Sequence, residues 1–176
     1  TTEIYTLSLH DALPILFYKE DIELIDKVLL MFLKRSMAKC AILIDKEGHL
    51  ITTQGETQSY ELDTICTLLA STFAATREWA RLLGEQEFSV LFHQGKRDSI
   101  QVTIVGERTL LAVIFDERTQ LGLVRLMCNE VSKKLNEVFE QSESRRSGAP
   151  ETNLVEEGFS ETARGLLDDL FGEETS

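Results

Sequence analysis

Side chains that could bind a metal ion or carry out nucleophilic and acid–base chemistry are few and widely separated in this sequence. Beyond residue 15 the histidines are His49 and His93, and neither has a cysteine or a second histidine at the spacing of a metal site. Cys40, Cys66 and Cys128 are too far apart in the sequence to make a zinc-binding or redox pair. We therefore expect turn histidines and buried thiols, with no catalytic residues, no metal and no cofactor.

Glycine motifs that bind phosphate groups are absent from the sequence. Neither GxxxxGK[ST] nor GxGxxG occurs, and no GxSxG motif marks a serine nucleophile. We therefore do not expect an enzyme with its own active site, and in particular we do not expect the chain to hydrolyse a nucleotide by itself.

The composition restricts the possible partners. The 176 residues carry a formal net charge of −12, and 43% of them are hydrophobic. Such an acidic chain repels nucleic acid phosphates and anionic lipids, so neither is an expected partner. No apolar run approaches the roughly 18 residues of a membrane span, and scattered cysteines suit a reducing compartment. We expect a cytoplasmic protein without membrane insertion.

The first segment, TTEIYTLSLHDALPI at residues 1–15, resembles the in-frame translation of a common sequencing-library adapter. It contains no Lys or Arg, so it lacks the pattern of a signal or transit peptide. We exclude it as an adapter-derived artefact. A folded domain is expected at residues 16–142, followed by a disordered acidic tail at residues 143–176.

Hydrophobic periodicity predicts three helices and five strands. Most of the strands are joined by tight turns, which favours antiparallel pairing. The predicted order is α-β-β-α-β-β-β-α, with helices at residues 17–38, 61–83 and 121–141 and strands at residues 40–44, 49–53, 88–93, 99–105 and 110–115.

The apolar patterns of the strands predict their positions in the sheet. The strands at 40–44 and 110–115 are entirely apolar, as expected of central strands covered on both faces. The strands at 49–53 and 88–93 then lie at the two edges. The predicted fold class is α+β, an α/β sandwich with a five-stranded antiparallel sheet. The helix at 61–83 covers one face, and the other two helices cover the opposite face.

The middle predicted helix has an unusual outer face on a helical wheel at about 100° per residue. Small residues occupy its first half and charged residues appear only later, whereas solvated helix faces usually carry long charged side chains. This face is either a surface rich in good helix formers or a docking platform that another helix or backbone can approach closely. The expected core face is Ile65, Leu69, Thr72, Phe73, Thr76, Trp79, Ala80 and Leu83, and the candidate partner-binding platform is Thr67, Ala70, Ser71, Ala74, Arg77, Glu78 and Arg81.

Several segments carry a resemblance to a known family. They are AILIDKEGHL at residues 41–50, LLGEQEF at 82–88, FHQG at 92–95, TIVGER at 103–108 and VIFDERTQLGLVRL at 113–126. In content and spacing they resemble the Roadblock/LC7 family, and within it the MglB-type regulators of bacterial gliding motility. The resemblance covers residues 16–141.

The resemblance implies a homodimer in which the third strands pair edge to edge and the middle helices pack together. It also implies a bacterial regulator that binds a small Ras-like GTPase of MglA type and stimulates GTP hydrolysis in polarity or motility control. Arg77 and Glu78 depart from the Gly- and Ala-rich platforms of such regulators. The implied platform includes Thr67, Ala70, Ala74 and Glu78, and the implied dimer edge is Phe88, Val90, Leu91 and Phe92.

Stimulation of GTP hydrolysis needs an oriented water and positive charge near the transferred phosphoryl group. Arg77, Arg81 and Arg118 are the candidates for an inserted arginine. The resemblance favours another mechanism, in which the dimer holds the switch segments of the GTPase so that the GTPase's own groups align. The alternative function is a Roadblock scaffold that binds a GTPase or motor complex without activating it. A ligand-sensing domain of profilin or PAS shape would need convergent polar groups, which the mostly aliphatic strands do not offer.

The predicted tail contains a second candidate contact. A polar linker at residues 142–157 precedes a segment at 159–171 with helical spacing of apolar residues. The segment is interpreted either as a frayed helix or as an amphipathic motif that docks in a partner groove. Its apolar residues are Phe159, Leu166, Leu167, Leu170 and Phe171.

Overall fold

The computed structural model describes residues 17–147. The elements follow the predicted order of helices and strands. They are α1 (Lys19–Ser36), β1 (Cys40–Asp45), β2 (Leu50–Gly55), α2 (Leu62–Leu82), β3 (Val90–Gln94), β4 (Ser99–Val105), β5 (Thr109–Phe115) and α3 (Leu121–Arg146).

The strands form one antiparallel five-stranded sheet in the order β2-β1-β5-β4-β3. This confirms the prediction that the two fully apolar strands are central, and they lie side by side in the sheet. Every residue of β1 and β5 is buried, because helices cover both faces of the sheet at these strands. β2 and β3 are the edge strands, as predicted.

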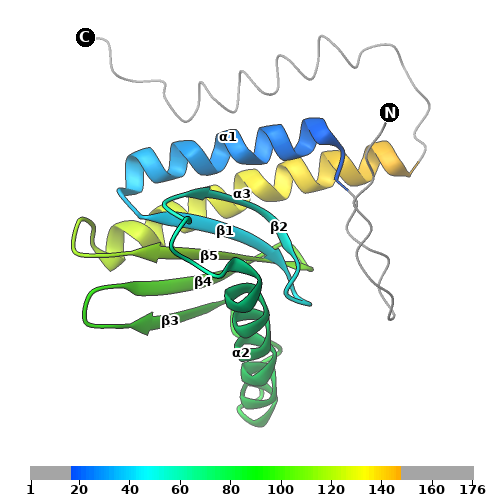
Figure 1. The fold of residues 1–176 in the computed structure, drawn as a ribbon. Helices are drawn as coiled ribbons and strands as arrows, with labels where there is room; N and C mark the ends of the chain where they lie inside the picture. Colours follow the sequence, from blue (N-terminus) through cyan, green and yellow to red (C-terminus); the bar gives the residue numbers. More distant parts are fainter. Residues whose placement is uncertain (1–16, 148–176) are drawn as a thin grey trace.

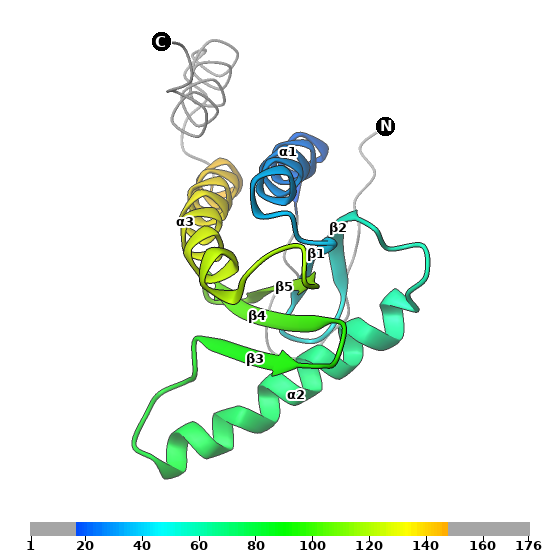
Figure 2. The same cartoon turned by 90° about the vertical axis from the view of Figure 1, so that its left-hand side faces the viewer.

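The helices lie on both faces of the sheet, with α1 beside α3 on one face and α2 on the other (Figures 1 and 2). Alternate residues of each strand point to opposite faces. Ala41 and Leu43 therefore join the core under α1 and α3, whereas Ile42 and Ile44 join the core under α2. The expected fold class is confirmed, with two apolar cores separated by the sheet.

A buried carboxylate connects the start of α1 to the end of α3. Asp21 is 0% exposed and accepts hydrogen bonds from the backbone amide of Tyr18, at 3.0 Å, and from the hydroxyl of Ser142, at 2.8 Å. It also forms an ion pair with Arg145. Since two of these partners belong to α3, the contacts explain why this helix continues to Arg146, beyond its predicted end at residue 141.

Other predictions differ in their boundaries or cannot be compared. The third strand begins at Val90 and not at residue 88, so Phe88 precedes the strand and was wrongly placed in it. The segment at 1–15 and the tail motif at 159–171 lie outside the described residues. None of the helices within residues 17–147 is long and apolar enough to span a membrane.

Candidate functional site

Helix α2 contacts the sheet through a narrow strip of its surface. Cys66, Phe73 and Ala80 on this strip are buried. Gly48, in the turn between β1 and β2, lies directly against the helix. A Cβ atom at Gly48 would be 3.1 Å from the Cα of Thr67, and its φ of +97° also favours glycine. Helix α2 runs across the sheet (Figure 2). Because the contact is narrow, the rest of its circumference is exposed, and two surfaces of different character lie next to each other on it.

One exposed surface, which we call the small face, consists of Thr67, Ser71, Ala74, Glu78 and Arg81. The hydroxyl of Thr67 donates to the carbonyl of Asp63 at 2.9 Å, and the hydroxyl of Ser71 donates to the carbonyl of Thr67 at 2.8 Å. Both side chains are thereby held against their own helix. The first half of the small face is consequently flat, which allows another backbone to approach closely.

Ala70 does not belong to this surface, and its predicted place on the platform was wrong. It is 5% exposed and packs in the core under α2 with Cys66 and Phe73. The helical wheel placed it among the small residues, but the sheet contact extends further around the helix on that side.

The other exposed surface, which we call the apolar face, lacks charged side chains. Asp63, Arg77, Glu78 and Arg81 are the charged residues of α2 and occupy roughly a third of its circumference, away from this face. Leu68 and Trp79 are 60% and 63% exposed. The apolar face consists of Ile65, Leu68, Thr72, Ala75, Trp79, Leu82 and Leu83.

The prediction that Thr72, Trp79 and Leu83 face the core was wrong, since all three are exposed. An apolar stripe on a helix predicts burial but does not say what buries it. The apolar stripe of α2 is wider than the strip of the helix that the sheet of one chain covers. That width, combined with the absence of charge, was the signal in the sequence for a second apolar contact.

The apolar face borders the free edge of the sheet. β3 pairs only with β4 among the strands described here, so one side of its backbone has no partner strand in the sheet. Val90 is exposed, and Leu91 and Phe92 are half-buried. A groove of about 220 Å³ lies between α2 and the sheet. It is lined by Ile65, Leu68, Leu69, Thr72, Leu91, His93, Ile100 and Val102.

Two of the candidate arginines are held by carboxylates next to α2. Arg77 lies 3.7 Å from a carboxylate oxygen of Glu87, and the ammonium of Lys46 donates to both oxygens of Glu87 at 3.0 and 3.1 Å. Arg81 donates to Glu78, one turn earlier, at 2.9 and 3.1 Å. Glu87 thus connects α2, the loop after it and the turn between β1 and β2.

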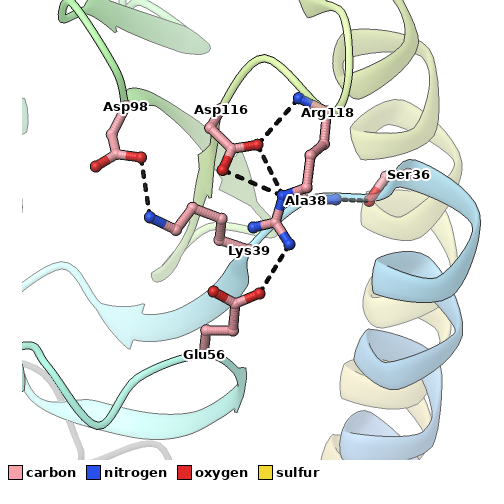
Figure 3. Close-up of polar contacts among 7 residues, drawn as sticks. All are labelled: Ser36, Ala38, Lys39, Glu56, Asp98, Asp116 and Arg118. Carbon is pink, nitrogen blue, oxygen red and sulfur yellow. Dashed lines mark hydrogen bonds and ion pairs between the residues drawn. The ribbon is translucent and has the colours of Figure 1, made fainter.

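The third candidate, Arg118, lies between β5 and α3 and binds two carboxylates (Figure 3). It donates to Asp116 at 2.9 and 3.1 Å and to Glu56 at 2.9 Å. Its guanidinium lowers the pKa of Asp116. Lys39 donates to Asp98 at 3.0 Å, and this bond raises the pKa of Lys39. The contacts of Arg118 with Asp116 and Glu56 connect the loop that precedes α3 to the loop that precedes α2.

His49 and the three cysteines have the positions expected of them, whereas His93 lies within β3 and not in a turn. His49 lies in the turn after β1, with its Nδ1 2.8 Å from a carboxylate oxygen of Asp45. All three thiols are buried, which raises the pKa of Cys128 to about 12. Within residues 17–147 no group of three His, Cys, Asp or Glu side chains could hold a metal ion.

Comparison with known proteins gives consistent matches. A family model described as "Roadblock/LC7 domain" matches residues 24–115. The MglB structure from Myxococcus xanthus is 44% identical, and the match covers 66% of this chain and 95% of that chain with a TM-score of 0.64. The gliding protein MglB from Thermus thermophilus is 35% identical, with coverage of 71% and 95% and a TM-score of 0.67. An MglB described as having a tetrameric arrangement is 35% identical, with coverage of 72% and 95% and a TM-score of 0.68.

Proposed function

The chain belongs to the Roadblock/LC7 family, and on this premise we propose that it is a homodimeric regulator of a small Ras-like GTPase of MglA type. We propose that it stimulates GTP hydrolysis, in the cytoplasm of a bacterium and in the control of polarity or motility. The similarity to MglB proteins, at 44% and 35% identity over 95% of each of those chains, carries this proposal.

The proposed dimer joins two copies through their β3 edges and apolar faces. An unpaired edge strand can extend its sheet by pairing with a second strand. Large exposed apolar patches without charge are typical of protein–protein interfaces. Val90, Leu91 and Phe92 remain the proposed edge residues, and Phe88 lies just before them. This arrangement leaves the two small faces exposed for the GTPase.

The small face is the proposed GTPase platform, without Ala70. Thr67, Ser71 and Ala74 let the partner approach the helix, because their side chains are short and the two hydroxyls bond to the helix itself. Glu78 and Arg81 supply polar contacts at one end, and Arg77 lies beside them. Polar groups around a flat apolar or neutral centre are the usual organisation of a specific interface.

The proposed mechanism does not use an inserted arginine. Each of Arg77, Arg81 and Arg118 has a carboxylate partner in the free chain. Insertion would break these pairs and would desolvate the guanidinium. Instead, the platform orders the switch segments of the GTPase, so that the GTPase's own water-orienting and charged groups align around the phosphoryl group.

Single-turnover GTP hydrolysis by an MglA-type GTPase tests this function. We expect the chain to accelerate hydrolysis, and we expect Arg77→Ala, Arg81→Ala and Arg118→Ala to retain the acceleration within about fivefold. Loss of an exposed ion pair changes free energies by at most about 1 kcal/mol, whereas an inserted arginine contributes about 10³-fold or more. If one alanine variant binds normally but no longer accelerates hydrolysis, that arginine is inserted and the mechanism is wrong.

A scaffold that binds the GTPase without activating it is the second candidate. Arg77 and Arg81 already have carboxylate partners, so this function follows if ordering of the switch segments alone does not accelerate hydrolysis. Complex formation in a pull-down with an unchanged hydrolysis rate would establish this function in place of the first.

The segment at residues 159–171 is proposed as a second contact with the GTPase. Deletion of residues 159–176 is expected to weaken the complex by about tenfold, because a tethered motif raises the local concentration of its binding site. Titration calorimetry of the full chain and of the deletion variant with the GTPase measures this effect. A Leu170→Ala/Phe171→Ala double variant should reproduce the deletion, and equal affinities for all three chains would contradict the proposal.

A further inference from the structure

Trp79 is the only tryptophan in the sequence, and it projects from the last part of α2 with 63% of its surface exposed. An indole gains more free energy from burial than most side chains, and tryptophan is enriched at the centres of interfaces. We propose that Trp79 of one copy inserts into the groove between α2 and the sheet of a second copy. This inference rests on the proposed homodimer and assigns its central contact.

The groove has the chemistry and size that an indole requires. Its lining includes Leu68 and Leu69 of α2, Leu91 of β3 and Ile100 of β4, so its surface is mainly aliphatic. Its volume of about 220 Å³ is of the order of one aromatic side chain. His93 also lines the groove and offers a polar atom for the indole N–H.

The position of Trp79 along α2 matches that of the groove under twofold symmetry. A twofold axis normal to the sheet at the β3 edge pairs the two strands antiparallel and places both α2 helices antiparallel on one face. Thr72 is the middle residue of α2, and Ile65 and Trp79 lie at equal distances on either side of it. Ile65 lines the groove. An axis that passes beside Thr72 therefore brings each Trp79 opposite Ile65 and the groove of the other copy.

A second copy is the occupant that these features select. The protruding side chain and the groove lie on the same uncharged face of the same helix, which is the self-complementary arrangement that a twofold interface needs. The groove is also continuous with the free β3 edge, so strand pairing and insertion of the indole would bury one contiguous surface. The insertion of Trp79 occurs twice in the dimer, whereas the two β3 strands form one pair across the axis.

The full chain provides its own reporter, because all tryptophan fluorescence comes from Trp79. Sedimentation velocity, emission spectra and acrylamide quenching are measured on one dilution series. We expect emission to shift to shorter wavelength and quenching to fall in parallel with dimer formation. Trp79→Ala is expected to raise the dimer Kd by about 100-fold. Thr72→Phe, which fills the groove, should raise the Kd and keep Trp79 accessible to acrylamide.

Leu126→Ala serves as the matched control, since Leu126 is 58% exposed on α3. It should leave the Kd and the spectra unchanged. If Trp79 is as accessible to acrylamide in the wild-type dimer as in the monomer, this inference is wrong, although the proposed dimer is supported. Shielding of Trp79 in a monomer, or only after the GTPase is added, would identify another occupant and also overturn it. A chain that stays monomeric at every concentration would overturn both the inference and the proposed dimer.

Discussion

An Ala74→Arg variant is expected to leave the GTPase hydrolysing GTP at its unstimulated rate. Ala74 lies in the flat part of the small face, between Ser71 and Glu78. A guanidinium at this position prevents close approach of the partner and loses hydration if the complex forms. Together these effects weaken binding by about 100-fold or more. Arginine is a good helix former and Ala74 is exposed, so the fold should tolerate the change.

Two controls separate the possible causes of such a loss. Asn129→Arg adds the same charge to an exposed position of α3 and should leave stimulation unchanged. Ala75→Arg adds it to the neighbouring residue of α2, which lies on the apolar face. That variant is expected to become monomeric in sedimentation velocity, whereas Ala74→Arg should remain dimeric. Full stimulation by a dimeric Ala74→Arg chain would show that the GTPase binds elsewhere.

A Gly55→Ala variant is expected to lose at least about 3 kcal/mol of unfolding free energy, a large part of the 5–15 kcal/mol typical of a domain. Gly55 ends β2 with a φ of +98°, which strains any residue with a Cβ. An added Cβ would also lie 2.3 Å from the carbonyl oxygen of Lys39 and 2.9 Å from the Cα of Cys40. These backbone atoms belong to the start of β1, so the pairing of the two strands would have to shift.

Gly84→Ala measures the backbone strain alone, so the difference between the two variants gives the steric part of the effect. Gly84 also has a positive φ, of +79°, but an added Cβ meets no atom within 4 Å. Only the backbone strain applies there, and it costs about 1–2 kcal/mol. Urea denaturation of the two variants should therefore give clearly different midpoints. Similar losses for both would mean that the contact between Gly55 and Lys39 relaxes easily.

The sheet was predictable because its signals are local. The unbroken apolar runs of β1 and β5 require cover on both faces, which places them at the centre. The pairing of Lys39 with Asp98 and of Arg118 with Glu56 was not predictable, because each joins residues far apart in the sequence. The end of α3 was missed for the same reason, since Ser142 stabilises the helix through Asp21 on α1.

The candidate site was predictable only in part. Periodicity correctly placed Thr67, Ser71 and Ala74 on the outside of α2, but it placed Ala70 outside and Trp79 inside. A helical wheel gives the relative directions of side chains and does not give the line along which the helix contacts the sheet. That line depends on packing against residues such as Gly48, which no local pattern of the helix contains.

The two exposed faces of α2 lie next to each other on one helix, and this position makes their occupancies interdependent. If self-association favours the arrangement that the GTPase binds, the GTPase must strengthen self-association by the same factor, since coupling between two binding equilibria is reciprocal. The apparent affinity for the GTPase then rises with the total concentration of the chain. The amount of protein in the cell would itself set how strongly each molecule acts.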